Sequence, residues 1–301
     1  MTVFNKTRSA LAGLALLAPV AGAALPVAAQ DANEVVITSE HVAGNIHVLF
    51  GQGGNIGVSV GEEGVFLIDD QFANLTDKIV AKIKTLSDKP IRFMINTHFH
   101  YDHTGGNENL GKAGTVIVAH DNVRQRMSKE AVVKAFNSTL PPAPNAALPV
   151  ITFDSELSLH LNGEETRAVH VEHAHTDGDS LIVFKQSNVI HMGDTFFVGI
   201  FPFIDTSNGG SVAGVLAAAE KAMEIADDNT RIIPGHGPLS DKAGLKTYHT
   251  MLSTVVERVK AAKAEGVSVE DLDADAILGD LNYAEVNDWA RRFLGIVYND
   301  V

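Results

Sequence analysis

The sequence contains no cysteine among its 301 residues. This absence excludes disulfides, thiolate nucleophiles, CxxC zinc sites and iron–sulfur clusters. Any metal in this protein must therefore be held by histidine and carboxylate side chains. Tryptophan and tyrosine are also scarce, with one and four residues, whereas histidine is common, with 13.

Positive charge is the second scarcity, because 23 lysines and arginines face 37 acidic residues, for a formal net charge of −14. A surface this acidic repels phosphate backbones, so the composition predicts a small-molecule substrate and no nucleic-acid partner. With 45% hydrophobic and 20% charged residues, the chain is typical of a globular protein that buries a core. The composition says nothing about the oligomeric state.

The N-terminal segment is typical of a secretory signal peptide over residues 1–29. Lys6 and Arg8 precede an apolar stretch, and small residues lead to a cleavage site expected after Ala29. An anchoring helix is the alternative, but the stretch is interrupted by glycine and proline and is short for the roughly 20 residues of a membrane span. We therefore expect a periplasmic protein whose mature chain, residues 30–301, does not span the membrane.

The rest of the chain alternates two β-rich blocks with helices. This order predicts an α+β fold in which two sheets form a sandwich with helices outside, as a single domain over residues 30–301. The expected strands are 35–37, 46–50, 56–60, 65–68, 91–95, 115–119, 150–153, 156–161, 167–171, 181–184, 189–191 and 231–233. The expected helices are 74–86, 107–110, 212–225, 242–264 and 284–298, and the proline-rich residues 141–144 are expected to form a loop.

A dense group of metal-ligand residues follows the strand at 91–95. His98 and His100 lie at i and i+2, so an extended segment points both imidazoles to the same side, toward one ion. The turn after them can bring Asp102 and His103 toward a second ion. One such histidine alone would more often be structural, but four ligand-type residues within six positions favour a metal site.

Three further candidates lie where apolar strands end, at His175, Asp194 and His236. Loops at strand ends are where a rigid scaffold presents functional groups, and a glycine lies near each candidate. Taken singly, Asp194 could be a turn residue and His236 an ordinary loop histidine. His173 is a rival to His175, although the Thr-x-Gly-Asp sequence after His175 favours the latter.

In order and spacing, these motifs resemble the metallo-β-lactamase superfamily. The resemblance includes His-x-His-x-Asp-His-Thr-Gly-Gly, His-Thr-x-Gly-Asp, a strand that ends in Gly-Asp, Pro-Gly-His-Gly and an early aspartate at Asp69. It implies a four-layered αββα sandwich with the metals at one edge of the sheets. By the same resemblance His98, His100 and His175 would bind one zinc, Asp102, His103 and His236 a second, and Asp194 would bridge both.

Two departures separate the chain from class B β-lactamases. Where their cysteine-using subclass has a thiolate, this sequence has Asp194, which is similar to glyoxalase II and lactonases. The lysine that those lactamases offer to the carboxylate of the drug is missing as well, since residues 195–210 contain no lysine or arginine. Loose selectivity, with weak or promiscuous β-lactam cleavage, follows from that loss.

The resemblance implies a periplasmic hydrolase in which two zinc ions share a hydroxide that attacks a carbonyl group. His98, His100, Asp102 and Asp194 would carry the catalysis. A β-lactam is the expected substrate, while a glyoxalase II-like thioester or lactone hydrolase shares every ligand and stays open. So does a zinc-binding accessory protein without turnover, and iron or manganese would suit the same ligands.

Aromatic residues near the motifs are candidates for substrate contact. Tyr101 lies inside the ligand motif, and Phe196 and Phe197 follow Asp194 directly. The two phenylalanines could pack in the core, or they could form an apolar wall of the substrate cleft.

Overall fold

A computed structural model describes residues 34–301 of the chain. The signal peptide expected over residues 1–29 lies outside the described residues. Within residues 34–301, no helix combines the length and the apolar character needed to cross a bilayer.

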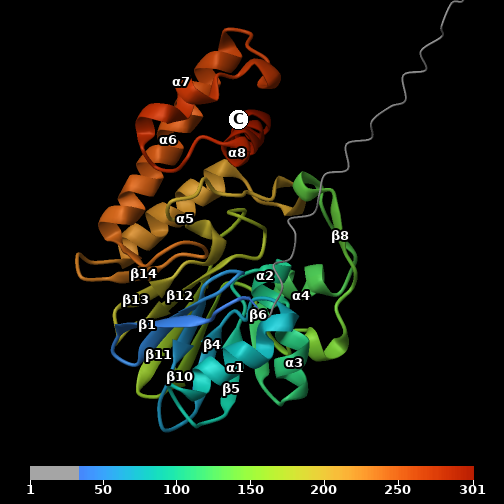
Figure 1. The fold of residues 1–301 in the computed structure, drawn as a ribbon, viewed down its shortest axis with the longest axis vertical. Coiled ribbons are helices and arrows are strands. Elements are labelled where there is room, and N and C mark those ends of the chain that lie inside the picture. Colours follow the sequence, from blue (N-terminus) through green and yellow to red (C-terminus); the bar gives the residue numbers. More distant parts are fainter. Residues whose placement is uncertain (1–33) are drawn as a thin grey trace, which may run out of the picture.

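Two mixed sheets form the centre of the molecule (Figure 1). The first has seven strands in the order β1-β2-β3-β4-β5-β6-β9, and the second has six strands in the order β10 to β15. The first sheet contains β1 (Thr38–Ala43), β2 (Ile46–Phe50), β3 (Ile56–Ser59), β4 (Val65–Ile68), β5 (Ile91–Ile95), β6 (Val116–His120) and β9 (Ile151–Phe153). The second contains β10 (Glu156–Leu161), β11 (Glu164–His170), β12 (Ser180–Phe184), β13 (Val189–His191), β14 (Arg231–Ile233) and β15 (Ser240–Asp241).

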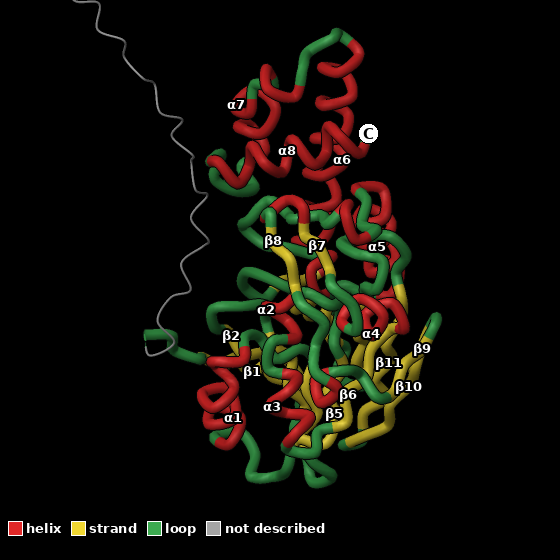
Figure 2. Tube along the Cα trace, turned by 90° about the vertical axis from the view of Figure 1, so that its right-hand side faces the viewer, coloured by secondary structure: helices red, strands yellow, loops and turns green. Residues whose placement is uncertain are grey.

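Helices cover the outer face of each sheet, and a small hairpin stands apart from both. The hairpin of β7 (Ala131–Val133) and β8 (Ser138–Leu140) rises beside the loops toward the C-terminal helices (Figures 1 and 2). The helices are α1 (Thr76–Lys84), α2 (Tyr101–Thr104), α3 (Asn107–Lys112), α4 (Asp121–Met127), α5 (Val212–Ile225), α6 (Lys242–Ala264), α7 (Ala274–Leu278) and α8 (Asp288–Asp300).

Three apolar clusters join these layers. The inner faces of the two sheets meet in one cluster, in which Phe66 of the first sheet packs on Phe184 of the second at 6.2 Å between ring centroids. A second cluster places α1 and α3 on the outer face of the first sheet, with Leu67 and Ile79 among its members. The third places α5, α6 and α8 on the second sheet. The molecule is therefore the predicted α+β sandwich with four αββα layers.

Parallel strand pairs bring distant parts of the sequence to one edge. β4 runs parallel to β5 and pairs Ile68 with Ile95, and β13 runs parallel to β14 and pairs His191 with Ile233. The carboxyl ends of parallel neighbours meet at the same edge of a sheet, so the loops that follow these strands converge there. Six of the seven predicted metal ligands lie beyond such strand exits, and His175 reaches the same edge from the loop between the antiparallel strands β11 and β12.

Some predicted elements differ from the structure. Residues 35–37 form no strand, because pairing with β2 begins only at Thr38, opposite Phe50; Val35 and Ile37 are instead buried in one apolar cluster with Leu49. The last helix begins at Asp288 rather than at 284, since the side chain of Asn287 caps it by accepting from the backbone N–H groups of residues 289 and 290. Five further elements, all of them short, were not predicted from the sequence: α2, where a turn was expected, α4, α7, β15 and the β7–β8 hairpin.

Candidate metal centre

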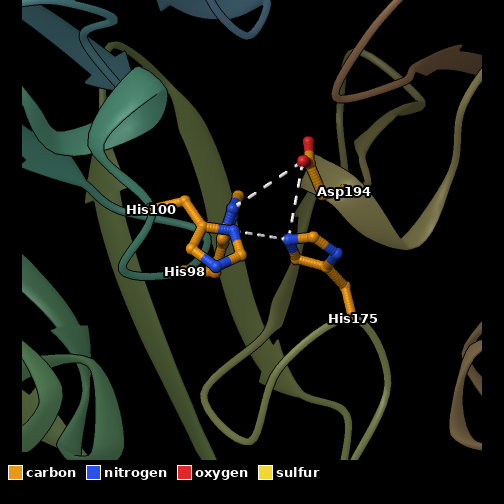
Figure 3. Close-up of side chains that lie close together, drawn as sticks. All are labelled: His98, His100, His175 and Asp194. Atoms are coloured by element: carbon orange, nitrogen blue, oxygen red, sulfur yellow. Dashed lines mark hydrogen bonds and ion pairs between the residues drawn. The ribbon is translucent and has the colours of Figure 1, made fainter. Parts of the chain in front are cut away.

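Four buried side chains from three loops converge on one point. His98 and His100 follow β5, His175 follows β11, and Asp194 follows β13 (Figure 3). Nδ1 of His100 lies 2.8 Å from Nε2 of His175. The Oδ2 atom of Asp194 lies 3.6 Å from Nε2 of His175 and 3.8 Å from Nε2 of His98. Three imidazole nitrogens and one carboxylate oxygen thus converge as candidate ligands for one ion.

A second group of ligand-type side chains lies beside the first and is partly exposed. It consists of Asp102, His103 and His236. Oδ2 of Asp102 lies 3.2 Å from Nε2 of His236 and 3.6 Å from Nε2 of His103. The other oxygen of Asp194, Oδ1, lies 3.0 Å from Nε2 of His103 and 3.4 Å from Nε2 of His236. Asp194 therefore presents one oxygen to each group.

Hydrogen bonds orient the first and the last histidine of the His-x-His-x-Asp-His motif through Asp69. Nδ1 of His103 lies 2.8 Å from Oδ2 of Asp69, which accepts its proton. Oγ1 of Thr97 donates to the same oxygen at 2.7 Å and lies 3.0 Å from Nδ1 of His98. Because Thr97 gives its only proton to Asp69, it accepts one from His98. Both imidazoles thus turn Nε2 toward the site, and the Nε2 atom of His98 carries no proton.

The other two histidines of the first group are oriented in the same way. Nε2 of His100 donates to Asp205 at 3.0 Å, which leaves Nδ1 to face His175. Nδ1 of His175 donates to the carbonyl oxygen of Phe203 at 2.8 Å. Such partners fix the tautomer and ring orientation of metal-binding histidines. Ser207 and Asn208 in turn donate to the buried Asp205.

Two glycines allow the backbone to approach these side chains. A Cβ atom at Gly54 would lie 2.0 Å from Cε1 of His103, and one at Gly235 would lie 2.0 Å from Oδ1 of Asp194. Any larger residue at either position would displace a ligand-type side chain. Gly235, which precedes His236, is therefore required by close packing against Asp194.

Burial and charge set the protonation of the site. Burial lowers the pKa of His175 to about 4 and that of His98 well below its usual value, so both imidazoles are neutral at pH 7. Burial opposes ionisation of Asp102, but the neighbouring His103 and His236 lower its pKa to about 2. Burial also opposes the charged form of His236, but Asp194 and Asp102 raise its pKa to about 9. The site therefore contains ionised carboxylates that require positive charge nearby.

The donor set fits bound divalent cations. Nε2 of His98 is buried and has no hydrogen-bond partner among the described residues, although it points toward Asp194. A buried nitrogen lone pair without a donor is costly, and a cation would satisfy it. Five imidazoles and two carboxylates in two adjacent groups suit zinc, and also other transition metals that accept nitrogen and oxygen ligands.

All seven predicted ligand residues come together in the structure, whereas the predicted substrate residues separate. Tyr101 is 50% exposed and its ring lies 5.8 Å from that of Phe72, whereas Phe197 stacks on the ring of His236 at 5.3 Å. Phe196 does not face the site: it is fully buried in the core against Tyr248. His173 points away, because its Nδ1 bonds the carbonyl oxygen of Gly209 at 2.9 Å.

Sequence reasoning missed Asp205, the hydrogen-bond partner of His100, which lies two residues after Phe203. The ring of Phe203 lies over His100 at 5.8 Å and against His175 at 5.6 Å between centroids. Asp205 follows the apolar run at 201–204 just as Asp69 follows the run at 65–68. That repeated pattern of an aspartate after an apolar run is the signal that could have identified Asp205.

Comparison with known proteins places the chain in a family. The model of the metallo-beta-lactamase superfamily matches residues 49–236, more than half of the chain. The protein therefore belongs to the metallo-β-lactamase superfamily, a superfamily of metal-dependent hydrolases.

Individual relatives are distant. A hydroxyacylglutathione hydrolase from Pelagibacter ubique (strain HTCC1062) is 27% identical over 140 residues, which is 44% of this chain and 50% of the relative. The alpha subunit of 2,4-dinitroanisole O-demethylase from Nocardioides sp. (strain JS1661) is 26% identical over 112 residues, or 37% of this chain and 31% of the relative. The matched part is thus half or less of the length of these curated relatives.

Solved structures support the same fold at low identity. The DIM-1 metallo-beta-lactamase has a TM-score of 0.60 and 18% identity, covering 73% of this chain and 99% of its own. The sec-alkylsulfatase Pisa1 from Pseudomonas sp. has a TM-score of 0.63 and 16% identity, covering 87% of this chain and 50% of its own.

Proposed function

We propose that this protein is a dinuclear zinc hydrolase that acts in the periplasm and cleaves a carbonyl substrate, with a β-lactam as the first candidate. The observation that carries the proposal is the position of Asp194, whose two carboxylate oxygens face the two separate groups of imidazoles. A carboxylate that bound a single ion would not need to direct its two oxygens toward two separate groups of ligands. Seven ligand-type side chains are also too many for one tetrahedral zinc.

The side chains would divide the work of hydrolysis. When bound, two zinc ions supply a hydroxide nucleophile at neutral pH and polarise the carbonyl group that it attacks. His98, His100 and His175 offer neutral nitrogen lone pairs, held in place by Thr97, Asp205 and the backbone. Asp102 and Asp194 offset the positive charge.

The aromatic residues at the rim have a positioning role in this proposal. Tyr101 is exposed beside the ligand motif, and Phe197 covers one face of His236. An apolar wall beside partly exposed ligands excludes water from the substrate and presents its carbonyl group. Phe196 has no part in this, because it is buried in the core.

Two observations support a β-lactam and one supports a thioester. The expected signal peptide would bring the enzyme to the compartment where β-lactams act, and lactamases such as DIM-1 have the same fold. Against this, Asp194 stands where the cysteine-using lactamases have their thiolate, and a hydroxyacylglutathione hydrolase is among the relatives. A glyoxalase II-like thioester or lactone hydrolase is therefore the second candidate.

A substrate panel tests the proposal. Zinc-loaded protein is assayed with nitrocefin, an acyl-homoserine lactone and a glutathione thioester, each with and without a chelator, and Asp194→Ala is the matched control. We expect chelator-sensitive turnover of nitrocefin that the variant lacks. Turnover of the thioester alone would favour the second candidate. Tight zinc binding without turnover of any substrate would contradict the hydrolase and indicate an accessory protein.

A further inference from the structure

A groove lies next to the first ligand group, between the β7–β8 hairpin, the loop at 202–206 and helix α8. Figures 1 and 2 both show the hairpin reaching toward the C-terminal helices. The groove encloses about 410 Å³, and its lining includes Phe136, Phe203, Trp289, Lys134 and Arg292. Helix α8 lies beyond residue 236, where the match to the superfamily model ends, so the residues that α8 contributes to the lining lie outside the matched region.

Aromatic rings form one wall and link the groove to the metal ligands. Phe136, at the tip of the hairpin, lies 4.8 Å from Phe203 and 5.9 Å from Trp289 between ring centroids. Phe136 is 43% exposed, so part of its ring is accessible to a ligand in the groove. The same Phe203 ring stacks on His100. A single side chain therefore contacts both the groove and the first ligand group.

The wall is held rigidly to the loop that borders the metal site. Nε1 of Trp289 donates to the carbonyl oxygen of Phe201 at 2.7 Å, and the ring of Phe201 stacks on Phe293 at 5.4 Å. Tyr283 donates its hydroxyl proton to the carbonyl oxygen of Phe197. A preorganised wall of this kind lowers the entropic cost of ligand binding.

Two cations border the aromatic wall of an otherwise acidic protein. Lys134 and Arg292 are exposed and line the groove. Neither has a carboxylate within ion-pair distance among residues 34–301. These two positive charges lie in a protein whose formal net charge is −14. The loop at 195–210 contains no lysine or arginine that could bind a substrate anion. The groove thus combines an aromatic wall with positive charge that has no internal partner.

We propose that this groove binds an aromatic group bearing a carboxylate, the distal end of the substrate whose carbonyl is cleaved at the metal centre. This rests on the proposed hydrolase function. Phe136, Phe203 and Trp289 contact the ring, and Arg292 and Lys134 contact the acid. Arg292 and Lys134 thereby replace the missing cation of the loop at 195–210 and make the C-terminal helix a determinant of specificity.

Trp289 itself reports the binding, because it is the only tryptophan in the chain. Chelator-treated protein is titrated with 4-phenylbutyrate and with its uncharged amide, and tryptophan emission is recorded. We expect a saturable change with the carboxylate and an affinity for the amide weaker by about five- to tenfold. Absence of a saturable change at millimolar carboxylate, or equal affinity for both compounds, would overturn the proposal.

A matched pair of variants on α8 assigns the charge. Arg292→Gln is expected to weaken carboxylate binding by about five- to tenfold, and Arg291→Gln, at the neighbouring exposed position outside the groove, to leave it unchanged. Both side chains are exposed, so both variants should fold. Phe136→Ala should weaken the binding of both 4-phenylbutyrate and its amide. Equal loss in the Arg291 and Arg292 variants would refute a specific contact.

Measurements of turnover test the groove and the hydrolase function independently of each other. Carbenicillin, whose side chain has a phenyl ring and a carboxylate, is compared with benzylpenicillin and with 6-aminopenicillanic acid. We expect the highest kcat/KM for carbenicillin, and loss of that preference in Arg292→Gln. Binding of 4-phenylbutyrate without hydrolysis of any substrate would uphold the groove and reject the function. Hydrolysis without preference and without dependence on Arg292 would reject the groove alone.

Discussion

At the scale of single residues, the two oxygens of Asp194 distinguish a shared ligand from one that serves a single ion. A carboxylate can reach two ions, whereas a thiolate serves mainly one. Its neighbours in space come from both ligand groups, His98 and His175 on one side and His103 and His236 on the other.

Replacement of Asp194 should therefore impair both metal sites together. We expect Asp194→Ala to lose both zinc equivalents and all hydrolysis, and Asp194→Asn to weaken binding because it removes a negative charge near two dications. Metal analysis and calorimetric titration measure this. Asp102→Ala is the control and should weaken mainly the second site. If Asp194→Ala bound two zinc ions with wild-type affinity, the shared-ligand assignment would be wrong.

Asp205 acts through His100 and is a positioning residue. Burial opposes its ionisation, but hydrogen bonds from His100, Ser207 and Asn208 hold its pKa at about 2. Asp205→Ala should lower zinc affinity of the first site by about 10- to 100-fold, because the imidazole loses its fixed orientation. Competition with a chromophoric chelator measures that affinity. Asp228→Ala, at an exposed position, should have no effect, and an equal loss there would contradict the role.

His170 gives the stability of the fold a pH dependence. Its ring stacks on His120 at 3.7 Å, and partial burial lowers its pKa below 6.5. Protonation therefore favours the unfolded chain, so the contribution of His170 is complete above pH 6.5 and is lost as the pH falls through its folded-state pKa. His170→Gln should flatten the pH dependence of urea unfolding below pH 6.5. The exposed His160→Gln should not, and equal flattening would contradict this account.

At the scale of elements, the strand exits decide where chemistry gathers. The parallel pairs β4–β5 and β13–β14 bring Asp69 next to the segment at 96–98, and Asp194 next to the turn at 234–236. The periodicity of each strand is visible in the sequence, and its order in the sheet is not. The short hairpin β7–β8 has too few residues for a periodic signal, so it escaped prediction.

The long helix α6 depends on a capped N-terminus. Asp241 accepts a hydrogen bond from the backbone N–H of Gly244 at 2.9 Å. Asp241→Ala should lower the free energy of unfolding by about 1 kcal/mol, and Asp241→Asn, which keeps an accepting oxygen, by much less. Denaturant titration measures both values. Equal losses in the two variants would show that charge, rather than the cap, matters.

At the scale of the whole molecule, the candidate metal centre joins the two halves of the sandwich. His98, His100, Asp102 and His103 follow a strand of the first sheet, and the other three ligand residues follow strands of the second. Metals bound there would stabilise only the folded chain, because unfolding separates the ligands. The strength of this coupling is measurable without any substrate.

Removal of metal should lower the melting temperature. At a zinc concentration of 100 times Kd, binding to the folded state alone adds about 2.7 kcal/mol to the free energy of unfolding. We expect a chelator to shift the calorimetric transition of the wild type downward and excess zinc to restore it. Asp194→Ala should show a much smaller shift. An unchanged transition in the chelated wild type would contradict metal binding at this edge.

The sequence alone determined the fold class and the seven ligand candidates. The motif from His98 to His103 is local, so its spacing is visible without a structure. Most strands can be predicted from apolar runs bounded by turn residues. The sequence also favoured His175 over His173 as a ligand. In the structure His175 contacts His100 in the first ligand group, whereas His173 bonds the carbonyl oxygen of Gly209.

Only the tertiary structure decided which oxygens and nitrogens face each other. The partners of Asp205, the burial of Phe196 and the groove between Phe136 and Trp289 all join residues far apart in the sequence. Phe196 and Phe197 are identical neighbours in the sequence, yet successive side chains of an extended segment point to opposite sides. One therefore packs in the core and the other covers a metal ligand, a difference that arises only from what lies on each side of the chain.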